Sequence, residues 1–308
     1  MLFRLFRTNF SRYLHNKTSL PELDFTKPTS DRLKTVSSNK QSYSNDESIL
    51  KIPLRGQCLF GLYPIELALQ AKRRKFYRLF FSETSNNNRQ LIENLAKDLS
   101  IPIEYTNSKI LDRLSFDRPH QGVCLDCSTI PIENIEQIQL KINPNKLSFD
   151  VCLVKIFDPM NLGAMIRSAH FFGIDRMILT RGTCQPSPVA SKASSGALEL
   201  TSIYSCRDLK HYLEVLHEQG DVAIICATHH GKIPLQTLSL NEIKKSFSNL
   251  QRIIVLIGNE HEGIEDEISQ LCHYNVSIQS NNESQISSLN ASVACALFLY
   301  HISAQINQ

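Results

Sequence analysis

The sequence predicts an α/β protein with a mainly parallel sheet in its second half and a smaller α/β domain before it. The first observation is the run 252–257, which is apolar after its first residue and rich in β-branched side chains. Such a run is typical of a strand that is buried on both faces. The second observation is that runs of this kind alternate with helical stretches along 148–308. This alternation favours parallel strands joined by crossover helices.

Composition divides the 308 residues into five parts. Residues 1–20 are basic, free of acids and interspersed with apolar side chains, as in a mitochondrial transit peptide. The alternative is a basic tail that stays on the protein and contacts RNA. The polar residues 21–50 are typical of a disordered linker. We assign 51–130 to the first domain, 131–147 to a second linker and 148–308 to the larger domain.

The first domain is predicted from alternating helical and apolar β-branched or aromatic stretches. Pro64 suits the first turn of its opening helix, where no backbone N–H is needed. The expected elements are a helix at 64–75, a strand at 76–82, a helix at 89–99, a strand at 101–105, a short helix at 108–114 and a strand at 121–127.

A basic cluster marks the end of the first predicted helix. Lys72, Arg73, Arg74 and Lys75 are consecutive, and two aromatic residues follow them. Four adjacent cations can neutralise several phosphates, so we expect them to contact RNA. The alternative is a solvated helix end, where cations are favoured in any case. We also expect RNA contact from Lys192, in the small polar segment 191–197.

The larger domain follows the same alternation. Gly173 suits the C-terminal end of its first helix. The expected elements are a strand at 149–157, a helix at 164–172, a strand at 176–180, a helix at 208–218, strands at 222–228 and 252–258, a helix at 266–272, a strand at 274–278 and a final helix at 289–301.

Overall composition excludes some classes of protein. No apolar run reaches the roughly 18 residues of a membrane helix, so we expect no membrane span. The net charge of +3 is too small to indicate a nucleic-acid partner by itself. The nine cysteines lack a regular framework, and we interpret them as reduced, mostly buried side chains. A metal site or redox pair at Cys124 and Cys127 is the alternative.

Polar residues gather where three of the predicted elements begin or end. Asn161 and Arg167 flank the start of a helix, Glu260 lies between Gly258 and Gly263, and 287–290 precede the last helix. In open α/β sheets, ligands bind beyond the carboxyl ends of the strands. Each group also has a simpler interpretation as a helix cap, a surface cation or a turn. Their joint arrangement favours a functional site.

Three short motifs in this order resemble those of the SpoU/TrmH family of RNA ribose 2′-O-methyltransferases, within the SPOUT superfamily. The segments 120–123 and 188–197 also resemble family sequences, so the resemblance covers about 52–305. The motifs are Asp158-Pro-x-Asn161-x-Gly163-x-x-x-Arg167, then Gly258-x-Glu260-x-x-Gly263, then Ser288-Leu289-Asn290-x-Ser292-Val293-Ala294.

The resemblance implies a SPOUT domain with a C-terminal trefoil knot, an L30e-like substrate-binding domain and a homodimer. It implies S-adenosylmethionine as cofactor, held largely by backbone among the knotted loops. The implied cofactor contacts are Thr228, Ile257, Gly258, Ile278 and Leu289. The implied catalytic residues are Asn161, Arg167, Glu260, Ser288 and Asn290. The family usually has a proline where this chain has Gln279.

Methyl transfer to a ribose hydroxyl requires alignment and stabilisation of a developing alkoxide. Because arginine stays protonated, we expect Arg167 to hold a neighbouring phosphate and stabilise that charge, with Glu260 orienting Arg167 or a substrate group. No metal is required. Together with the predicted transit peptide, the resemblance implies a guanosine ribose in mitochondrial large-subunit rRNA as the target. A tRNA target remains open, as does a non-catalytic RNA-binding assembly factor of the same fold.

Overall fold

A computed structural model describes residues 52–84, 89–138, 143, 145–259, 262–280 and 288–306. The chain divides into the units Met1–Ile52 and Pro53–Gln308, and all the helices and strands described here belong to the second unit. The predicted transit peptide at 1–20 and linker at 21–50 lie outside the described residues. Within the described residues, no helix is long and apolar enough to cross a membrane.

The first sheet contains four strands in the order β1-β4-β2-β3. β2 and β3 are parallel, whereas β4 runs antiparallel to both β1 and β2. The bounds are β1 (Gln57–Phe60), α2 (Leu62–Ala71), β2 (Phe76–Ser82), α3 (Gln90–Asp98), β3 (Ile103–Thr106), α4 (Ser108–Leu114) and β4 (Val123–Cys127). The sequence had predicted every element of this domain except β1.

The second sheet contains eight strands in the order β10-β12-β9-β11-β6-β7-β8-β5. All of its pairings are parallel, which confirms the predicted fold class. Its strands are β5 (Glu133–Asn134), β6 (Ser148–Val154), β7 (Arg176–Thr180), β8 (Ile203–Cys206), β9 (Val222–Ala227), β10 (Ile233–Pro234), β11 (Arg252–Gly258) and β12 (Tyr274–Ser277).

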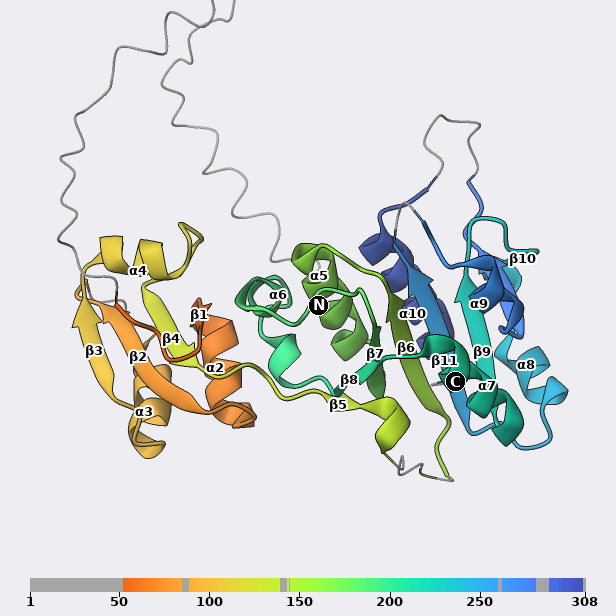
Figure 1. The fold of residues 1–308 in the computed structure, drawn as a ribbon, viewed down its shortest axis with the longest axis horizontal. Coiled ribbons are helices and arrows are strands. Elements are labelled where there is room, and N and C mark those ends of the chain that lie inside the picture. Colours follow the sequence, from red (N-terminus) through yellow and green to blue (C-terminus); the bar gives the residue numbers. More distant parts are fainter. Residues whose placement is uncertain are drawn as a thin grey trace, which may run out of the picture. The chain divides into compact units, whose positions relative to one another are not determined.

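Helices cover both faces of this sheet (Figure 1). The α-helices are α5 (Pro159–Phe171), α6 (Pro188–Ala193), α7 (Leu209–Gln219), α8 (Leu240–Ser246), α9 (Asp266–Gln270) and α10 (Ala291–Ile306). The 3₁₀ turns are η2 (Ile135–Gln137), η3 (Ala197–Glu199) and η4 (Leu235–Thr237). One core joins the sheet to α5, α8 and α10, and the other joins it to α7, α9 and η2.

Strand β11 lies at the centre of this arrangement, between β9 and β6. Its side chains alternate between the two cores, with Ile253 and Val255 in one and Ile254 and Leu256 in the other. Period-two alternation explains why a fully buried parallel strand reads as a continuous apolar run. The prediction of a strand buried on both faces is confirmed.

Helix α5 begins five residues earlier than the predicted 164. The Asp158 carboxylate accepts a hydrogen bond from the Met160 backbone N–H at 2.9 Å, and Pro159 occupies the first helical position. Gly163, which precedes the predicted helix, lies inside α5. A Cβ there would be 2.5 Å from the Ala193 Cβ, so this glycine permits close packing of α5 on α6. Asn161 therefore lies in the first turn of α5, not before it.

The predicted trefoil knot depends on how the chain passes between β12 and α10. Residues 281–287 of this connection lie outside the described residues. The knot therefore stays a prediction.

Candidate active site

A pocket of about 330 Å³ lies at the carboxyl end of the parallel sheet. Its walls come from the segments that follow β9, β11 and β12 and from the start of α10. This is the edge at which open α/β sheets bind ligands, because the loops after parallel strands converge there.

The loop after β11 forms a tight turn against this pocket. The Asn259 side-chain oxygen accepts from the Glu262 backbone N–H at 2.7 Å, and its carbonyl accepts from Gly263 N–H at 3.1 Å. A Cβ on Gly258 would lie 2.3 Å from the Gly263 carbonyl oxygen. Gly263 has a φ of +64°, which favours glycine. Both glycines are thus required by the turn itself.

The five predicted cofactor contacts come together in this pocket. They approach it from three strand ends and from the residues that precede α10, and Ser288 lines it as well. The five are Thr228, Ile257, Gly258, Ile278 and Leu289. The structure therefore places residues separated by up to 61 positions around one cavity, from 228 to 289.

Two predicted catalytic residues from distant motifs are in direct contact. The Asn290 side-chain amide donates to the Asn161 side-chain oxygen at 3.2 Å. Asn290 also caps α10, because its Oδ1 accepts from the Ser292 backbone N–H at 2.9 Å. The cap interpretation is confirmed for Asn290, and its catalytic role stays a prediction.

Arg167 is exposed on α5. Within the described part of the chain, no residue forms a hydrogen bond or ion pair with it. Glu260 lies outside the described residues, so the predicted pairing of Glu260 with Arg167 stays a prediction.

Sequence reasoning missed several residues that line the pocket. Glu262 and Asp266 bring two carboxylates to it, and Phe298 contributes an aromatic side chain from α10. Phe298 follows Ala291 and Ala294, which also line the pocket, by seven and four positions. The helical spacing of these residues within the predicted helix 289–301 could have predicted that Phe298 shares a face with Ala291 and Ala294.

Comparison with known proteins identifies this arrangement. The SpoU rRNA methylase family matches residues 148–300, and the substrate-binding domain of RNA 2′-O-ribose methyltransferases matches 58–132. The human mitochondrial rRNA methyltransferase 1 is 30% identical over 267 residues, which cover 82% of this chain and 73% of the human protein. The chain belongs to the SpoU family.

Two further relatives extend the comparison. The 23S rRNA (guanosine-2′-O-)-methyltransferase of Coxiella burnetii is 26% identical, over 80% of this chain and 95% of that protein. The SpoU methyltransferase AviRb from Streptomyces viridochromogenes, solved with S-adenosylmethionine, is 20% identical with a TM-score of 0.63, and the match covers 80% of this chain and 89% of AviRb. As a SpoU protein, this chain is an S-adenosylmethionine-dependent RNA 2′-O-ribose methyltransferase.

The basic cluster of the SpoU substrate-binding region does not act as one surface. The Arg74 side chain is fully buried, and it forms an ion pair with Glu199 and donates to the Ser128 carbonyl at 2.9 Å. Arg73 donates to the carbonyls of Glu199 and Thr201 at 3.3 and 2.6 Å. The predicted RNA contact is wrong for Arg74 because this guanidinium is enclosed by protein.

The remaining predicted RNA contacts differ in their surroundings. Lys72 and Lys75 are exposed and remain available to phosphate. The half-buried Lys192 donates to the Gln121 side-chain oxygen at 2.7 Å, and loss of hydration lowers the pKa of Lys192. A Cβ on Gly61 would lie 2.3 Å from the Lys192 ammonium, so glycine leaves room for this side chain.

The nine cysteines are all free thiols, and all but Cys184 and Cys272 are buried. Burial raises the pKa of Cys127 to about 12, which keeps this thiol protonated and unreactive. These observations agree with the interpretation of the cysteines as small buried side chains.

Proposed function

We propose that this chain methylates the ribose 2′-hydroxyl of a guanosine in mitochondrial large-subunit rRNA. The main support is that motif residues far apart in the sequence meet at one pocket. In addition, 82% of this chain is similar to the human mitochondrial enzyme. The similarity to a 23S rRNA guanosine methyltransferase supports the choice of nucleotide.

The pocket fits the proposed cofactor in its chemistry. Ile257, Ile278 and Leu289 offer apolar surface for an adenine ring, and Gly258 allows close approach of the backbone. Glu262 and Asp266 complement a positively charged ligand. When bound, S-adenosylmethionine supplies a methyl group on a positively charged sulfur.

The chain's own residues then position the ribose. Asn161 and Asn290, joined by their hydrogen bond, offer polar groups beside the pocket, and Ser288 offers a hydroxyl within it. The protonated Arg167 guanidinium holds a neighbouring phosphate and stabilises the alkoxide that develops at the 2′-oxygen. Glu260 orients Arg167 or a substrate group.

RNA binding in this proposal uses the exposed Lys72 and Lys75 together with Lys192, which lies beside Gln121. Cations neutralise backbone phosphates and position the RNA, while the choice of nucleotide depends on how a structured loop presents it.

The proposed homodimer uses one face of α10. Val293, Leu297 and Tyr300 are exposed by 48%, 40% and 61%. Their spacing of four and three residues places them on one face of the helix. The Tyr300 ring lies 6.0 Å from that of Phe172, which extends this apolar surface to the end of α5. A second copy of the chain that covers this surface would remove it from water.

The proposal is tested by mass-spectrometric mapping of 2′-O-methylated nucleotides in mitochondrial rRNA and tRNA. Cells carrying Arg167→Ala are compared with cells carrying the wild-type chain, with Lys245→Ala as a surface control on α8. Loss of one guanosine mark in large-subunit rRNA, with the Lys245 variant normal, is the expected result. Loss of a tRNA mark would overturn the target, and no lost mark would overturn the catalytic role or the mitochondrial location.

A further inference from the structure

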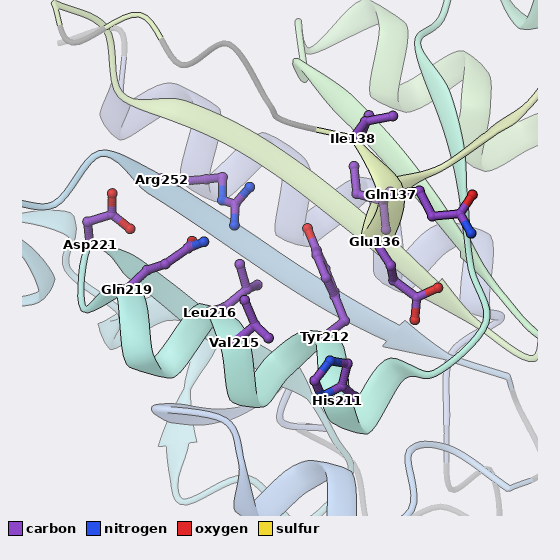
Figure 2. A pocket seen from close by; sticks show the side chains of 11 residues that line it. Glu136, Gln137, Ile138, His211, Tyr212, Val215, Leu216, Gln219, Asp221 and Arg252 are labelled. Carbon is purple, nitrogen blue, oxygen red and sulfur yellow. The ribbon is translucent and has the colours of Figure 1, made fainter.

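A second pocket, of about 610 Å³, lies on the face of the sheet that α7 covers. It lies between α7 and the segment 135–138, and it reaches the first residue of β11, Arg252 (Figure 2). Ile135, Val215 and Leu216 give it an apolar wall. None of its lining residues lines the methyltransferase pocket.

Arg252 brings a buried charge to this pocket without a matching hydrogen bond. The residue is 1% exposed, and neither Nε nor Nη2 has a hydrogen-bond partner among the described residues. The nearest carboxylate oxygen, Asp150 Oδ2, is 3.9 Å from Arg252 Nε. A buried guanidinium without hydrogen-bond partners in the protein is costly, because it has lost its hydration.

Asp150 does not balance this charge alone, because a second arginine already uses it. Arg176 Nε lies 3.0 Å from each Asp150 carboxylate oxygen, and Asp150 is fully buried. Two guanidinium groups thus share one carboxylate. The cluster of Asp150, Arg176 and Arg252 by itself has two cations for one anion, while Glu136 and Asp221 bring two carboxylates to the pocket lining.

Tyr212 adds an unused donor to the same pocket. It is 7% exposed, and its hydroxyl has no hydrogen-bond partner among the described residues. Figure 2 shows the Tyr212 side chain entering the pocket from α7 and the Arg252 side chain entering it from β11. Both groups thus hold donors that no described protein group uses, and the guanidinium fork matches a carboxylate or phosphate in shape.

The two acidic residues of the pocket do not accept hydrogen bonds from Arg252 or Tyr212 in the described part of the chain. Glu136 accepts from the backbone N–H groups of Arg207 and Asp208, at 3.2 and 2.9 Å. Asp221 lines the pocket, but its Oδ1 has no hydrogen-bond partner, and no ion pair with Arg252 is present within the described residues.

We propose that this pocket binds a small organic oxyanion. Its carboxylate or phosphate group is held by Arg252 and Tyr212, and its apolar body packs against Ile135, Val215 and Leu216. Small-molecule sites usually combine apolar walls with a few convergent polar groups, and this pocket has both, with polar side chains forming the larger share of its lining. The proposal is independent of the RNA target, since it concerns a separate pocket that shares no lining residue with the methyltransferase pocket.

The test is isothermal titration calorimetry of the full chain with inorganic phosphate and with benzoate, in a buffer that contains chloride as the only other anion. Saturable binding of phosphate, of benzoate or of both supports the proposal. Benzoate alone indicates a carboxylate ligand with an apolar body, and phosphate alone indicates a phosphate ester. If neither ligand binds, the polar groups are satisfied by water, and the proposal is overturned.

Four variants assign the binding to this pocket. Arg252→Met removes the guanidinium and should abolish binding, whereas Tyr212→Phe should weaken it by about tenfold through the loss of one charge-assisted hydrogen bond. Lys245→Met removes a surface charge on α8 and should leave binding unchanged. Asp221→Asn removes an acid from the pocket and should preserve or strengthen binding. Unchanged binding in Arg252→Met would overturn the proposal.

Melting temperatures measured with and without the anion test the proposal independently of the binding measurements. Without phosphate or benzoate, Arg252→Met should melt at or above the wild-type temperature, because an apolar side chain replaces an unsatisfied charge. At a saturating concentration of whichever anion binds, the wild-type chain should gain about 5 °C and the variant nothing. An equal gain in both proteins would overturn the assignment to Arg252.

Discussion

The guanidinium of Arg74 and the carboxylate of Glu199 form a two-point ion pair, with Nε to Oε2 at 2.7 Å and Nη2 to Oε1 at 2.9 Å. Both side chains are fully buried. Arg74 belongs to the substrate-binding region and Glu199 to the methylase region, so this pair joins the two matched parts of the chain. Ser191 Oγ also donates to Glu199, at 2.9 Å.

We expect Arg74→Met to lower the free energy of unfolding by about 3–5 kcal/mol, because it leaves the Glu199 carboxylate buried without its partner. The double variant Arg74→Met with Glu199→Leu should recover most of this loss, since it removes both charges from the interior. Urea denaturation measures both values, with Lys75→Met as the surface control. The explanation would be contradicted if the double variant lost as much unfolding free energy as Arg74→Met and Glu199→Leu lose in total when made separately.

The neighbouring cations show how far the sequence could predict this site. Four adjacent basic residues read as one surface, but only burial distinguishes Arg74 from Lys75. That burial depends on Glu199, a contact across 125 positions that no local pattern specifies. The same limit applies to Arg252. The sequence predicted its position at the start of a strand, but it could not predict that this side chain is buried without hydrogen-bond partners.

The strands were more predictable because their signals are local. β2 and β7 match their predicted ranges, 76–82 and 176–180, since apolar runs between polar turns set their limits. The start of α5 was predicted at 164, after Gly163, although this glycine lies inside the helix and permits packing against Ala193. The predicted cofactor contacts came from motif resemblance, because the convergence of β9, β11 and β12 is a property of the tertiary fold.

Gly258→Ala should impair cofactor binding. The added Cβ would lie 2.3 Å from the Gly263 carbonyl oxygen, so the loop that lines the pocket must move. We expect the Kd for S-adenosylmethionine to rise by roughly tenfold or more, since displacement of binding groups by even about 1 Å is costly. Isothermal titration calorimetry provides the measurement.

Gly220→Ala is the matched control for this prediction. Gly220 also has a positive φ, +70°, but a Cβ there meets no atom within 4 Å. This variant should lower stability through backbone strain while leaving the Kd for S-adenosylmethionine unchanged. Equal Kd values for both glycine variants and the wild-type chain would show that Gly258 does not shape the site.

The exposed lysines should contribute to RNA affinity through charge alone. The double variant Lys72→Ala with Lys75→Ala should weaken binding to RNA of any sequence and should flatten its dependence on salt. If each lysine neutralises one phosphate, the slope of log K against log salt should become smaller by roughly 1.5. Filter binding over a range of salt concentrations measures this slope, with Lys245→Ala as control. An unchanged slope would remove both lysines from the RNA surface.

His273 should remain neutral well below the usual range for histidine. Partial removal from water, and then the nearby His217, lower the pKa of His273 to about 4. Its Nδ1 accepts from the Ile224 backbone N–H at 3.1 Å, and protonation at that nitrogen would break this bond. The unfolded chain takes up this proton near pH 6.5, so between about 6.5 and 4 it binds more protons than the folded chain.

The contribution of His273 to stability is therefore complete above about pH 6.5 and is lost as the pH falls towards 4. Unfolding measured at several pH values should show a smaller loss over this range in His273→Gln than in the wild-type chain. His170→Gln, at an exposed position on α5, is the control. Nuclear magnetic resonance can follow the His273 ring directly, and a midpoint near 6.5 would contradict the prediction.

Arg167→Lys separates the shape of the side chain from its charge. Lysine keeps the positive charge but lacks the planar fork that can hold a phosphate and an alkoxide together. We expect kcat to fall by about 100-fold, as when one donor to a developing oxyanion is lost. The KM for S-adenosylmethionine should change little, because Arg167 does not line the pocket proposed for the cofactor.

Stability distinguishes this effect from damage to the fold. Arg167 is exposed, so the free energy of unfolding should stay within about 0.5 kcal/mol of the wild-type value. Arg207→Lys, at an exposed position before α7, should leave both turnover and stability unchanged. Near-normal turnover by Arg167→Lys would mean that a point charge suffices at this position. Arg167 would then attract the RNA backbone without the two-point contact on which its proposed role in the methyl transfer depends.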